Sequence, residues 1–352
     1  MPEIVQWNDI KRDFSDALLV GNGGSIALSD NFSYKSLYGY ADKHDLLQKE
    51  AAAVFDKFYK KERDFERVLY RLWQADYINE RFNVSKDERD KVRTGYTKVR
   101  RSLIDAVKDV HPPYKPSENK LWNVGQFISG FKTVFSLNYD LMLYWASQQI
   151  NENSPNLIKD GFTMKVPRNK NQKTRTFAFS NDISKLREPF GLNDSSTLVF
   201  YPHGSLLLYQ TKAKRQERKI TSSSEDGLLN TITDFWSRND GNPIFVCEGD
   251  SDRKLEAISG SQYLTHVFQE ELPRGGKSLA IYGWGMGQQD SHIVKQLAQG
   301  QYQKIAMSIH TKNKGPNQLD REMDEYLSKL KQIVSPEHVK FFDSASDGCW
   351  KN

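Results

Sequence analysis

The segment Asp16-Ala-Leu-Leu-Val-Gly-Asn-Gly-Gly-Ser25 is the most informative part of the 352-residue chain for predicting its fold. Its first half is a short apolar run, as expected for a buried strand, and its second half is a glycine-rich turn. A buried strand that leads directly into such a turn often begins a doubly wound nucleotide-binding sheet. We therefore expect an α/β fold whose sheet begins at this strand.

Further apolar runs predict strands along the rest of the chain. They are Thr133–Leu137, Ser196–Tyr201, Leu206–Tyr209, Pro243–Cys247, Ser278–Tyr282, Lys304–Ile309 and Val339–Phe342. Helical patterns alternate with these runs, which is typical of α/β architecture with a mostly parallel sheet. We interpret residues 1–352 as a single domain. It contains a helical insertion at 45–130, where Ser85 and Glu88 predict a capping box, and a polar, loop-rich excursion at 151–195.

The composition narrows the class of protein. Hydrophobic residues make up 38% and aromatic residues 12% of the chain, which rules out a disordered protein. No window approaches 18 consecutive apolar residues, and the first residues carry acids without an apolar core, so neither a membrane span nor a signal peptide is expected. We expect a soluble, cytoplasmic protein. The net charge of +5 suits anionic ligands without demanding nucleic acid.

The two cysteines, Cys247 and Cys349, lie far apart and lack any CxxC spacing. A disulfide scaffold and a zinc ribbon are both excluded. The histidines other than His203 form no HxH or HExxH pattern, so we expect no catalytic metal site.

Glycine-rich or polar segments directly follow four of the predicted strands. They are Gly21-Asn-Gly-Gly-Ser25, Asn138-Tyr-Asp140, His203-Gly204 and Gly283-Trp-Gly-Met-Gly-Gln-Gln-Asp290. In an open α/β sheet, ligands bind beyond the carboxyl ends of the strands, so these segments are expected to converge on one site.

Each segment also has a purely structural interpretation. A tight turn after a strand needs glycine whether or not it binds phosphate. Asn138 is a common type of helix cap. His203 lies between a proline and a glycine, where we expect it to be exposed at an edge, yet a lone histidine is more often structural than catalytic. A different motif, Phe245-Val-Cys-Glu-Gly-Asp-Ser-Asp252, is similar to the Toprim magnesium site of primases and some nucleases, but the Asp-x-Asp that this fold needs after its next strand is missing.

Taken in order, the four segments resemble the sirtuin-like NAD-binding superfamily, and most closely its bacterial branch, whose members consume NAD during antiphage defence. Residues 21–25 match the Gly-x-Gly-x-Ser loop with one extra residue, Asn138-Tyr-Asp140 matches the Asn-x-Asp, and His203-Gly204 matches the catalytic His-Gly. The later strand ending resembles Gly283-Trp-Gly285, and in the bacterial branch it continues to an acid, as at Asp290. The resemblance covers about residues 16–310.

The resemblance implies a Rossmann-like, mostly parallel sheet and the cleavage of NAD+ between nicotinamide and ribose. It implies that His203, whose ordinary pKa is near 6.5, acts as the base, that Asn138 holds the ribose or the water, and that Asp140 either orients the asparagine or caps its helix. The residues implied in binding NAD+ are Gly21, Asn22, Gly23, Gly24, Ser25, Asn31, Gly204, Gly283, Trp284, Gly285 and Asp290. The resemblance implies that NAD+ is the substrate and that no metal is needed.

Two departures point away from deacylation. The four-cysteine zinc ribbon of the deacylases is missing, and Asp30-Asn-Phe-Ser33 replaces their Pro-Asp-Phe-Arg. The first half of the chemistry, NAD+ cleavage, remains. Such an enzyme needs control, which suggests a homo-oligomer or a sensor or ATPase subunit, with the charged helices at 45–110 as one docking surface. The rival hypothesis is a non-catalytic module that senses NAD or ADP-ribose. The basic stretches Lys165–Arg175 and Lys212–Lys219 lack the interleaved aromatic residues that stack on bases, so a nucleic-acid role is not favoured.

Overall fold

The computed structural model describes residues 3–33, 36–57, 63–165, 176–180, 182–187, 196–211, 215–222, 224–238, 240–246 and 250–352. An eight-stranded sheet runs through its centre in the order β1-β13-β12-β11-β2-β3-β7-β4, and every neighbouring pair in it is parallel. Its strands are β1 (Ile4–Val5), β2 (Ala17–Val20), β3 (Thr133–Ser136), β4 (Ile158–Asp160), β7 (Thr197–Phe200), β11 (Ser278–Tyr282), β12 (Lys304–Ile309) and β13 (Val339–Asp343).

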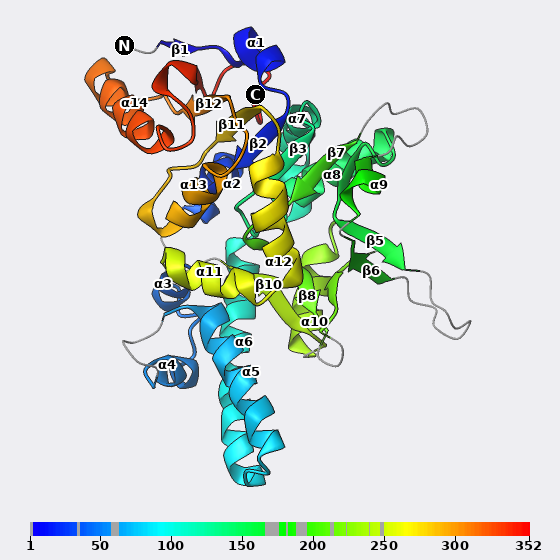
Figure 1. The fold of residues 1–352 in the computed structure, drawn as a ribbon. Helices are drawn as coiled ribbons and strands as arrows, with labels where there is room; N and C mark the ends of the chain where they lie inside the picture. The colour runs from blue at the N-terminus through cyan, green and yellow to red at the C-terminus, as the bar shows by residue number, and fades with distance from the viewer. Residues whose placement is uncertain are drawn as a thin grey trace.

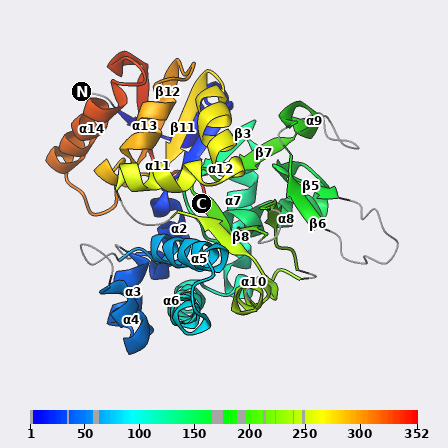
Figure 2. The same cartoon turned by 60° about the horizontal axis from the view of Figure 1, so that its bottom comes forward.

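The central strands are buried along their whole length, because helices cover both faces of the sheet (Figures 1 and 2). Parallel sheets covered in this way need apolar residues on both faces, which explains the unbroken apolar runs in the sequence. The helices around the sheet are α1 (Trp7–Ile10), α2 (Asn22–Leu28), α7 (Tyr114–Ser129), α8 (Met142–Asn153), α11 (Ser251–Ser259), α12 (Gln262–His266), α13 (Ser291–Leu297) and α14 (Pro316–Leu330). This α/β architecture confirms the predicted mostly parallel sheet.

The order of the strands places a switch point between β2 and β11. From β2 the chain adds β3 and then β7 on one side of the sheet, whereas β11, β12 and β13 later extend it on the other side. The loops that leave β2 and β11 therefore diverge, and such a point is where open α/β sheets bind their ligands.

A second, antiparallel sheet of five strands, in the order β10-β8-β9-β6-β5, was not predicted. Its strands are β5 (Phe162–Lys165), β6 (Thr176–Phe179), β8 (Gly204–Gln210), β9 (Glu217–Lys219) and β10 (Asn242–Phe245). The segment 151–195, predicted to be rich in loops, thus contributes β4 to the large sheet and β5 and β6 to the small one, together with the helix α9 (Ile183–Arg187). Residues 166–175 and 188–195 of that segment lie outside the described residues.

The predicted Toprim-like strand also belongs to the small sheet. It corresponds to β10, which pairs antiparallel with β8, and the acidic residue Asp250 caps α11 through a hydrogen bond from the Arg253 N–H (3.0 Å). A strand at the edge of an antiparallel sheet does not provide the parallel setting that the Toprim motif requires. Glu248 and the rest of residues 247–249 lie outside the described residues.

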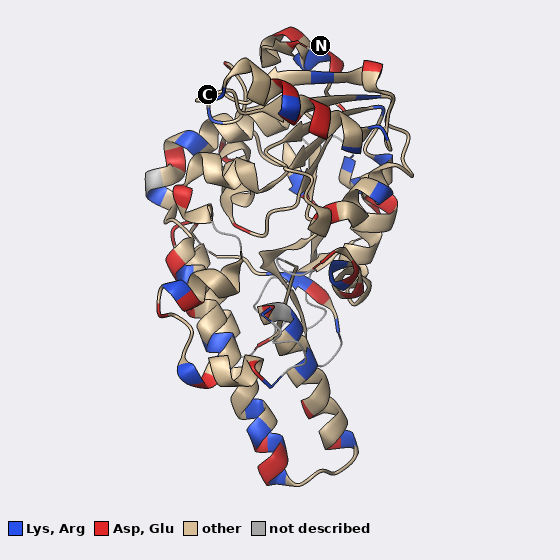
Figure 3. Ribbon diagram, turned by 90° about the vertical axis from the view of Figure 1, so that its left-hand side faces the viewer, with Lys and Arg blue, Asp and Glu red and all other residues tan. Residues whose placement is uncertain are grey.

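A helical module lies between β2 and β3, in the region of the predicted insertion at 45–130. It contains α3 (Leu37–Lys43), α4 (Lys49–Phe55), α5 (Phe65–Arg81) and α6 (Lys86–Val110). Helices α5 and α6 form a long antiparallel hairpin that projects from the body of the molecule, with charges of both signs along it (Figures 1 and 3). Ser85 caps α6, since its hydroxyl accepts a hydrogen bond from the Glu88 N–H (3.4 Å). No described helix is both long and apolar enough to cross a membrane.

Candidate functional site

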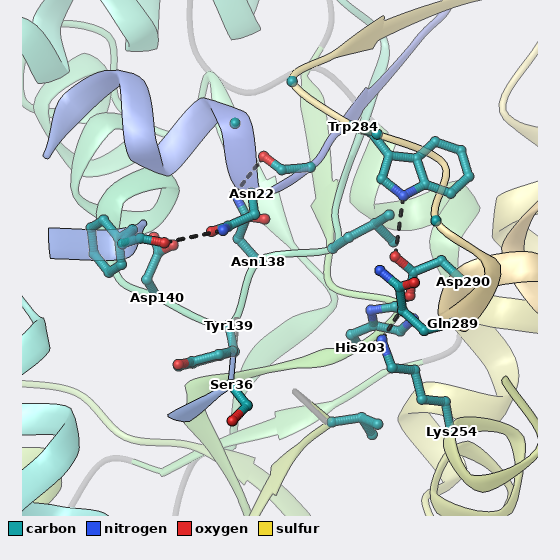
Figure 4. A pocket seen from close by; sticks show the side chains of 18 of the residues that line it. Asn22, Ser36, Asn138, Tyr139, Asp140, His203, Lys254, Trp284, Gln289 and Asp290 are labelled. Atoms are coloured by element: carbon teal, nitrogen blue, oxygen red, sulfur yellow. Dashed lines mark hydrogen bonds and ion pairs between the residues drawn. The ribbon is translucent and has the colours of Figure 1, made fainter. Parts of the chain in front are cut away.

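A pocket of about 710 Å³ opens at the carboxyl ends of β2, β3 and β11 and beside the turn that joins β7 to β8 (Figure 4). This volume lies within the range of about 300–1,000 Å³ that is usual for small-molecule sites. Each of the four segments singled out in the sequence contributes to it. The predicted residues that line the pocket are Gly21, Asn22, Gly23, Asn138, Asp140, His203, Gly283, Trp284, Gly285 and Asp290.

Four other predicted residues do not line the pocket. Ser25 lies behind it and contacts Asn138, as described below. Asn31 is exposed in a short 3₁₀ turn. Gly24 packs beneath the first loop, where its carbonyl accepts a hydrogen bond from the Trp350 indole (3.0 Å). Gly204 has a φ of +76°, and a Cβ there would lie 2.2 Å from the Ile244 carbonyl oxygen, so its place in the fold alone requires glycine.

Asn138 is held by a buried chain of hydrogen bonds. Its Nδ2 group donates to the Gly21 carbonyl (3.0 Å) and to the Ser25 hydroxyl (2.8 Å). Ser25 in turn donates to Asp140 (2.5 Å). Because both amide hydrogens are used, only the Oδ1 of Asn138 is left to accept a hydrogen bond from a ligand in the pocket.

Asp140 fills both roles that the sequence left open. One carboxylate oxygen accepts from Ser25 and so orients Asn138, and the other accepts from the Met142 N–H (2.9 Å) at the start of α8. Burial raises the pKa of Asp140, although these hydrogen bonds act in the opposite direction. The side chain is therefore a positioning group at the base of the pocket.

The two glycine loops pack against each other backbone to backbone. The Gly21 N–H donates to the Tyr282 carbonyl (2.9 Å) and the Gly23 N–H to the Gly283 carbonyl (2.7 Å). A Cβ on Gly23 would lie 2.7 Å from that carbonyl oxygen, and Gly283 has a φ of +65°. These N–H groups are thus engaged within the protein, so the first loop offers a ligand fewer backbone donors than the sequence suggested.

His203 is buried, with only 2% of its surface exposed, and this overturns the expectation that it is exposed at an edge. The turn that carries it lies where the chain passes from the large sheet to the small one, and the His203 carbonyl accepts a hydrogen bond from the Val246 N–H (2.7 Å). Burial, followed by the nearby Lys254 ammonium, lowers the pKa of His203 from 6.5 to about 3. The ring is therefore neutral at physiological pH.

The His203 ring belongs to a chain of neutral donors and acceptors. Its Nε2 lies 2.9 Å from the Nε2 of His292, whose Nδ1 lies 3.3 Å from the Ser251 hydroxyl. The backbone of Leu137 also hydrogen-bonds to the His203 ring and favours its protonated form, as an accepting carbonyl does. One tautomer satisfies all these contacts: Ser251 donates to His292, His292 donates to His203, and His203 donates to Leu137.

Lys254 and Asp290 form a buried ion pair in the wall of the pocket. Their Nζ–Oδ1 distance is 2.7 Å, and the two side chains are 6% and 13% exposed. The Trp284 indole donates to the second oxygen of Asp290 (3.3 Å). Burial acts to raise the pKa of Asp290, but His203, Lys254 and these hydrogen bonds outweigh it and lower the pKa. In Figure 4 this group and His203 lie across the pocket from Asn22, Asn138 and Asp140.

Several residues of the pocket escaped sequence reasoning. Lys254 lines the pocket from α11, whereas the buried His292 on α13 lies behind the wall, in contact with His203. Nothing in their spacing distinguishes either residue from ordinary helix residues. The other unpredicted lining residues are Phe32, Ser36, Leu37, Leu137, Tyr139, Val246, Gly287 and Gln289. The short spacing Asp290-Ser-His292 was the one local signal that could have found His292.

The described residues also contain a group able to hold a metal ion, although the sequence predicted none. One ligand atom each from His203, Asp290 and His292 lies within 4.8 Å of the other two. These residues come from two distant parts of the sequence, so no local motif marks them.

The two basic stretches are described only in part. Residues 166–175 and 212–214 lie outside the described residues. In the second stretch, Lys219 forms a buried ion pair with Asp160 (2.5 Å), and Glu217 caps α12 by accepting from the Tyr263 N–H (2.6 Å). At least this part of the stretch holds the fold together.

The fold and the site define an α/β protein with a polar pocket at the switch point of a parallel sheet. Over residues 18–350 the chain matches the family described as Domain of unknown function (DUF4917), and it belongs to that family. No curated protein matches the chain.

Proposed function

We propose that this protein is a sirtuin-like NAD+ glycohydrolase, which cleaves the nicotinamide–ribose bond of NAD+ to give nicotinamide and ADP-ribose. The observation that carries the proposal is the presence of Asn138 and His203 in one pocket, together with the two glycine loops at the switch point. Asparagine and histidine were predicted as a pair from segments 65 residues apart in sequence, and the fold gives both access to the same cavity. Dinucleotides bind at this place in doubly wound sheets.

The chemistry needs little acid assistance, because nicotinamide leaves as a neutral molecule that takes the electron pair of the C–N bond. A water oxygen then forms the new bond to the ribose carbon and releases a proton. The transition state resembles an oxocarbenium ion, so the site must place the water and support positive charge on the sugar. The free Oδ1 of Asn138 can accept a hydrogen bond from the water or from a ribose hydroxyl.

His203 is the base in this proposal. The neutral ring has a lone pair to accept the proton, but in this structure Nε2 faces His292 at 2.9 Å. Proton transfer at that atom therefore requires His203 and His292 to separate when substrate binds. The two glycine loops pack closely and carry no side chain at Gly285, where no neighbouring atom lies within 4 Å of a Cβ position. The rest of the dinucleotide can therefore approach the backbone there.

The proposed biological role is that of an NAD-depleting effector in bacterial antiphage defence, held inactive by self-association or by a sensor or ATPase subunit. Exposed apolar side chains on α5 and at its C-cap support a docking surface there. Phe82 is 79% exposed, and Tyr70, Tyr77 and Ile78 are also exposed. Light scattering on the purified chain, compared with Tyr77→Ser/Phe82→Ser, measures self-association through this helix; a strict monomer in both would leave the separate subunit as the proposed control.

The second candidate is a module that senses NAD or ADP-ribose without cleaving it. The engagement of the His203 Nε2 by His292 favours this alternative, because an engaged base does not activate water. The sensor would bind the dinucleotide in the same pocket and release no nicotinamide.

The deciding experiment follows nicotinamide and ADP-ribose by chromatography after the purified protein is incubated with NAD+ at high protein concentration. We expect His203→Ala and Asn138→Ala to lower the rate by about 10²–10⁴-fold, whereas His310→Ala, which changes an exposed histidine, leaves it unchanged. A calorimetric titration with NAD+ accompanies it. Binding without cleavage would favour the sensor, and the absence of both would contradict the proposal.

A further inference from the structure

At and behind the wall of the pocket that carries His203, three metal-ligating side chains lie close together. The Nε2 atoms of His203 and His292 lie 2.9 Å apart, and a ligand atom of Asp290 lies within 4.8 Å of a ligand atom of each ring. Two imidazoles and one carboxylate are the ligand set of many catalytic zinc and iron sites. All three residues are on elements of the scaffold or at their ends, which fixes their positions.

The distance between the two nitrogens fits shared ligation. Imidazole nitrogens that bind one ion at about 2.0–2.1 Å lie about 2.9 Å apart at a right angle and about 3.3 Å apart in a tetrahedron. The observed separation equals that of neighbouring ligands in an octahedral ion, but it is also the length of the hydrogen bond between the rings, whose centroids lie 5.1 Å apart with the two nitrogens nearly in line. A shared ion therefore requires the two rings to turn, so that their lone pairs meet beside the line that joins the nitrogens.

The outer contacts of the cluster are also those of a metal site. Ligating histidines usually engage their second nitrogen with a carbonyl or another polar group, and ligating carboxylates are themselves hydrogen-bonded. Here the His203 ring bonds to the backbone of Leu137, His292 contacts Ser251 through Nδ1 (3.3 Å), and Asp290 accepts from Trp284. An arriving ion needs the proton of the His292 Nε2 to leave, and that proton can move to Nδ1, where the Ser251 oxygen accepts it.

One group opposes an ion. The Lys254 ammonium lies 2.7 Å from Asp290 Oδ1 and neutralises the carboxylate charge that would otherwise attract the ion. An ion and this ammonium are therefore alternative partners of Asp290, since two cations beside one buried carboxylate repel each other. Removing this ammonium should therefore tighten the binding of an ion, whereas a chance cluster of side chains predicts no such effect.

We propose that His203, His292 and Asp290 form a binding site for a first-row divalent transition-metal ion such as Zn²⁺ or Co²⁺, and that Lys254 competes with the ion for Asp290. If the proposed function holds, the ion removes the His203 lone pair from proton transfer, so the metal-loaded protein does not cleave NAD+. The binding itself stands on the geometry alone and does not depend on that activity.

The test titrates chelator-treated, full-length protein with Co²⁺, whose visible absorption reports coordination by nitrogen and oxygen, and then displaces it with Zn²⁺. We expect one Co²⁺ per chain in the wild type. His292→Gln and Asp290→Asn should weaken binding by at least about 10–100-fold, the range known for the loss of outer partners alone. Lys254→Met should tighten binding, and His310→Ala should leave it unchanged. Circular dichroism confirms that each variant is folded.

The outcomes separate the metal site from the proposed function. Saturable binding with opposite shifts in Lys254→Met and His292→Gln supports the site, whether or not the protein cleaves NAD+. The absence of a one-to-one Co²⁺ complex in the folded wild type, or equal affinity in all variants, overturns it. If the protein cleaves NAD+ and one equivalent of Zn²⁺ leaves the rate unchanged while occupying the site, the inhibitory part of the proposal is wrong.

Discussion

The hydroxyl of Ser25 donates a 2.5 Å hydrogen bond to the Asp140 carboxylate, although 115 positions separate the two residues in the chain. The same hydroxyl accepts from Asn138, so Ser25 links the buried Asp140 carboxylate to the Asn138 amide in the pocket and fixes the position of that amide. A serine in the first glycine loop thus acts through the residue that it orients.

Replacing this hydroxyl tests that role. We expect Ser25→Ala to lower the free energy of unfolding by about 1–3 kcal/mol, because Asp140 and Asn138 each lose a buried partner. The rate of nicotinamide release should also fall, by less than the roughly 10²–10³-fold that follows the loss of a direct donor. Urea unfolding and the chromatographic assay measure the two effects. Ser29→Ala is the control, because Ser29 is half-buried and its hydroxyl accepts only a long hydrogen bond from the Asn31 N–H (3.4 Å); equal effects in the two variants would contradict the role of Ser25.

Substituting Gly285 distinguishes a glycine that the ligand requires from one that the fold requires. A Cβ at this position meets no atom within 4 Å, so Gly285→Ala should leave the melting temperature unchanged. If the dinucleotide lies against the loop, as proposed, the added methyl group should weaken NAD+ binding in a calorimetric titration. Gly23→Ala is the matched opposite, since its Cβ would lie 2.7 Å from the Gly283 carbonyl oxygen and should destabilise the protein without any ligand. Unchanged NAD+ affinity in Gly285→Ala would place the ligand elsewhere in the pocket.

The ion pair between Asp160 and Lys219 joins the large sheet to the small one. Both side chains are mostly buried, at 15% and 11% exposure, and lie 2.5 Å apart. We expect Asp160→Ala to cost about 3–5 kcal/mol, because it leaves the lysine charge buried and unpaired. Lys219→Met in the same chain should recover much of that loss. Chemical denaturation of the single and double variants measures the coupling, and additive losses would show that the pair is too hydrated to matter.

The pH dependence of stability should reveal His111. Burial lowers its pKa from 6.5 to about 4, although the hydrogen bond between Nδ1 and the Pro112 carbonyl (2.9 Å) acts in the opposite direction. The other ring nitrogen, Nε2, accepts from the Leu141 N–H (2.9 Å). Below pH 6.5 the unfolded chain gains a proton that the folded chain refuses until about pH 4. Its contribution is therefore present above pH 6.5 and is lost as the pH falls, by up to about 1.4 kcal/mol per pH unit.

His111→Gln should remove this contribution. The free energy of unfolding of the wild type should fall more steeply than that of the variant between pH 6.5 and 4.5, with a difference in slope of about one proton. Comparing the two proteins at each pH cancels the titration of the carboxylates that they share. Parallel slopes would mean that His111 is protonated in the folded state.

The large sheet could be predicted because its strands carry a simple signal. Ala17–Val20 and Ser278–Tyr282 are unbroken apolar runs that end in glycine, and burial on both faces leaves no other pattern open to them. The small sheet lacked that signal. Its strand Glu217–Lys219 consists of three charged residues, and these become acceptable in a strand only because Asp160 and the start of α12 neutralise the buried ones.

The residues of the pocket likewise fall into those that the sequence could predict and those that it could not. Asn138 and His203 directly follow strands, so their convergence could be predicted from the topology of parallel sheets. Lys254 and His292 lie on helices, and only the packing of α11 and α13 around the turn at His203 brings Lys254 to the pocket and His292 to the His203 ring. The burial of His203, and with it the low pKa, likewise depends on a second sheet that the sequence did not announce.

Trp350 supports the first glycine loop, through its hydrogen bond to Gly24 and through the stacking of its ring on Tyr282 (ring centroids 4.8 Å apart). During synthesis, the loop at residues 21–25 leaves the ribosome early, whereas the tryptophan that holds it follows more than 300 residues later. Domains generally begin to fold from their first-made segments. Here the pocket takes its final shape only after residue 350 has been made.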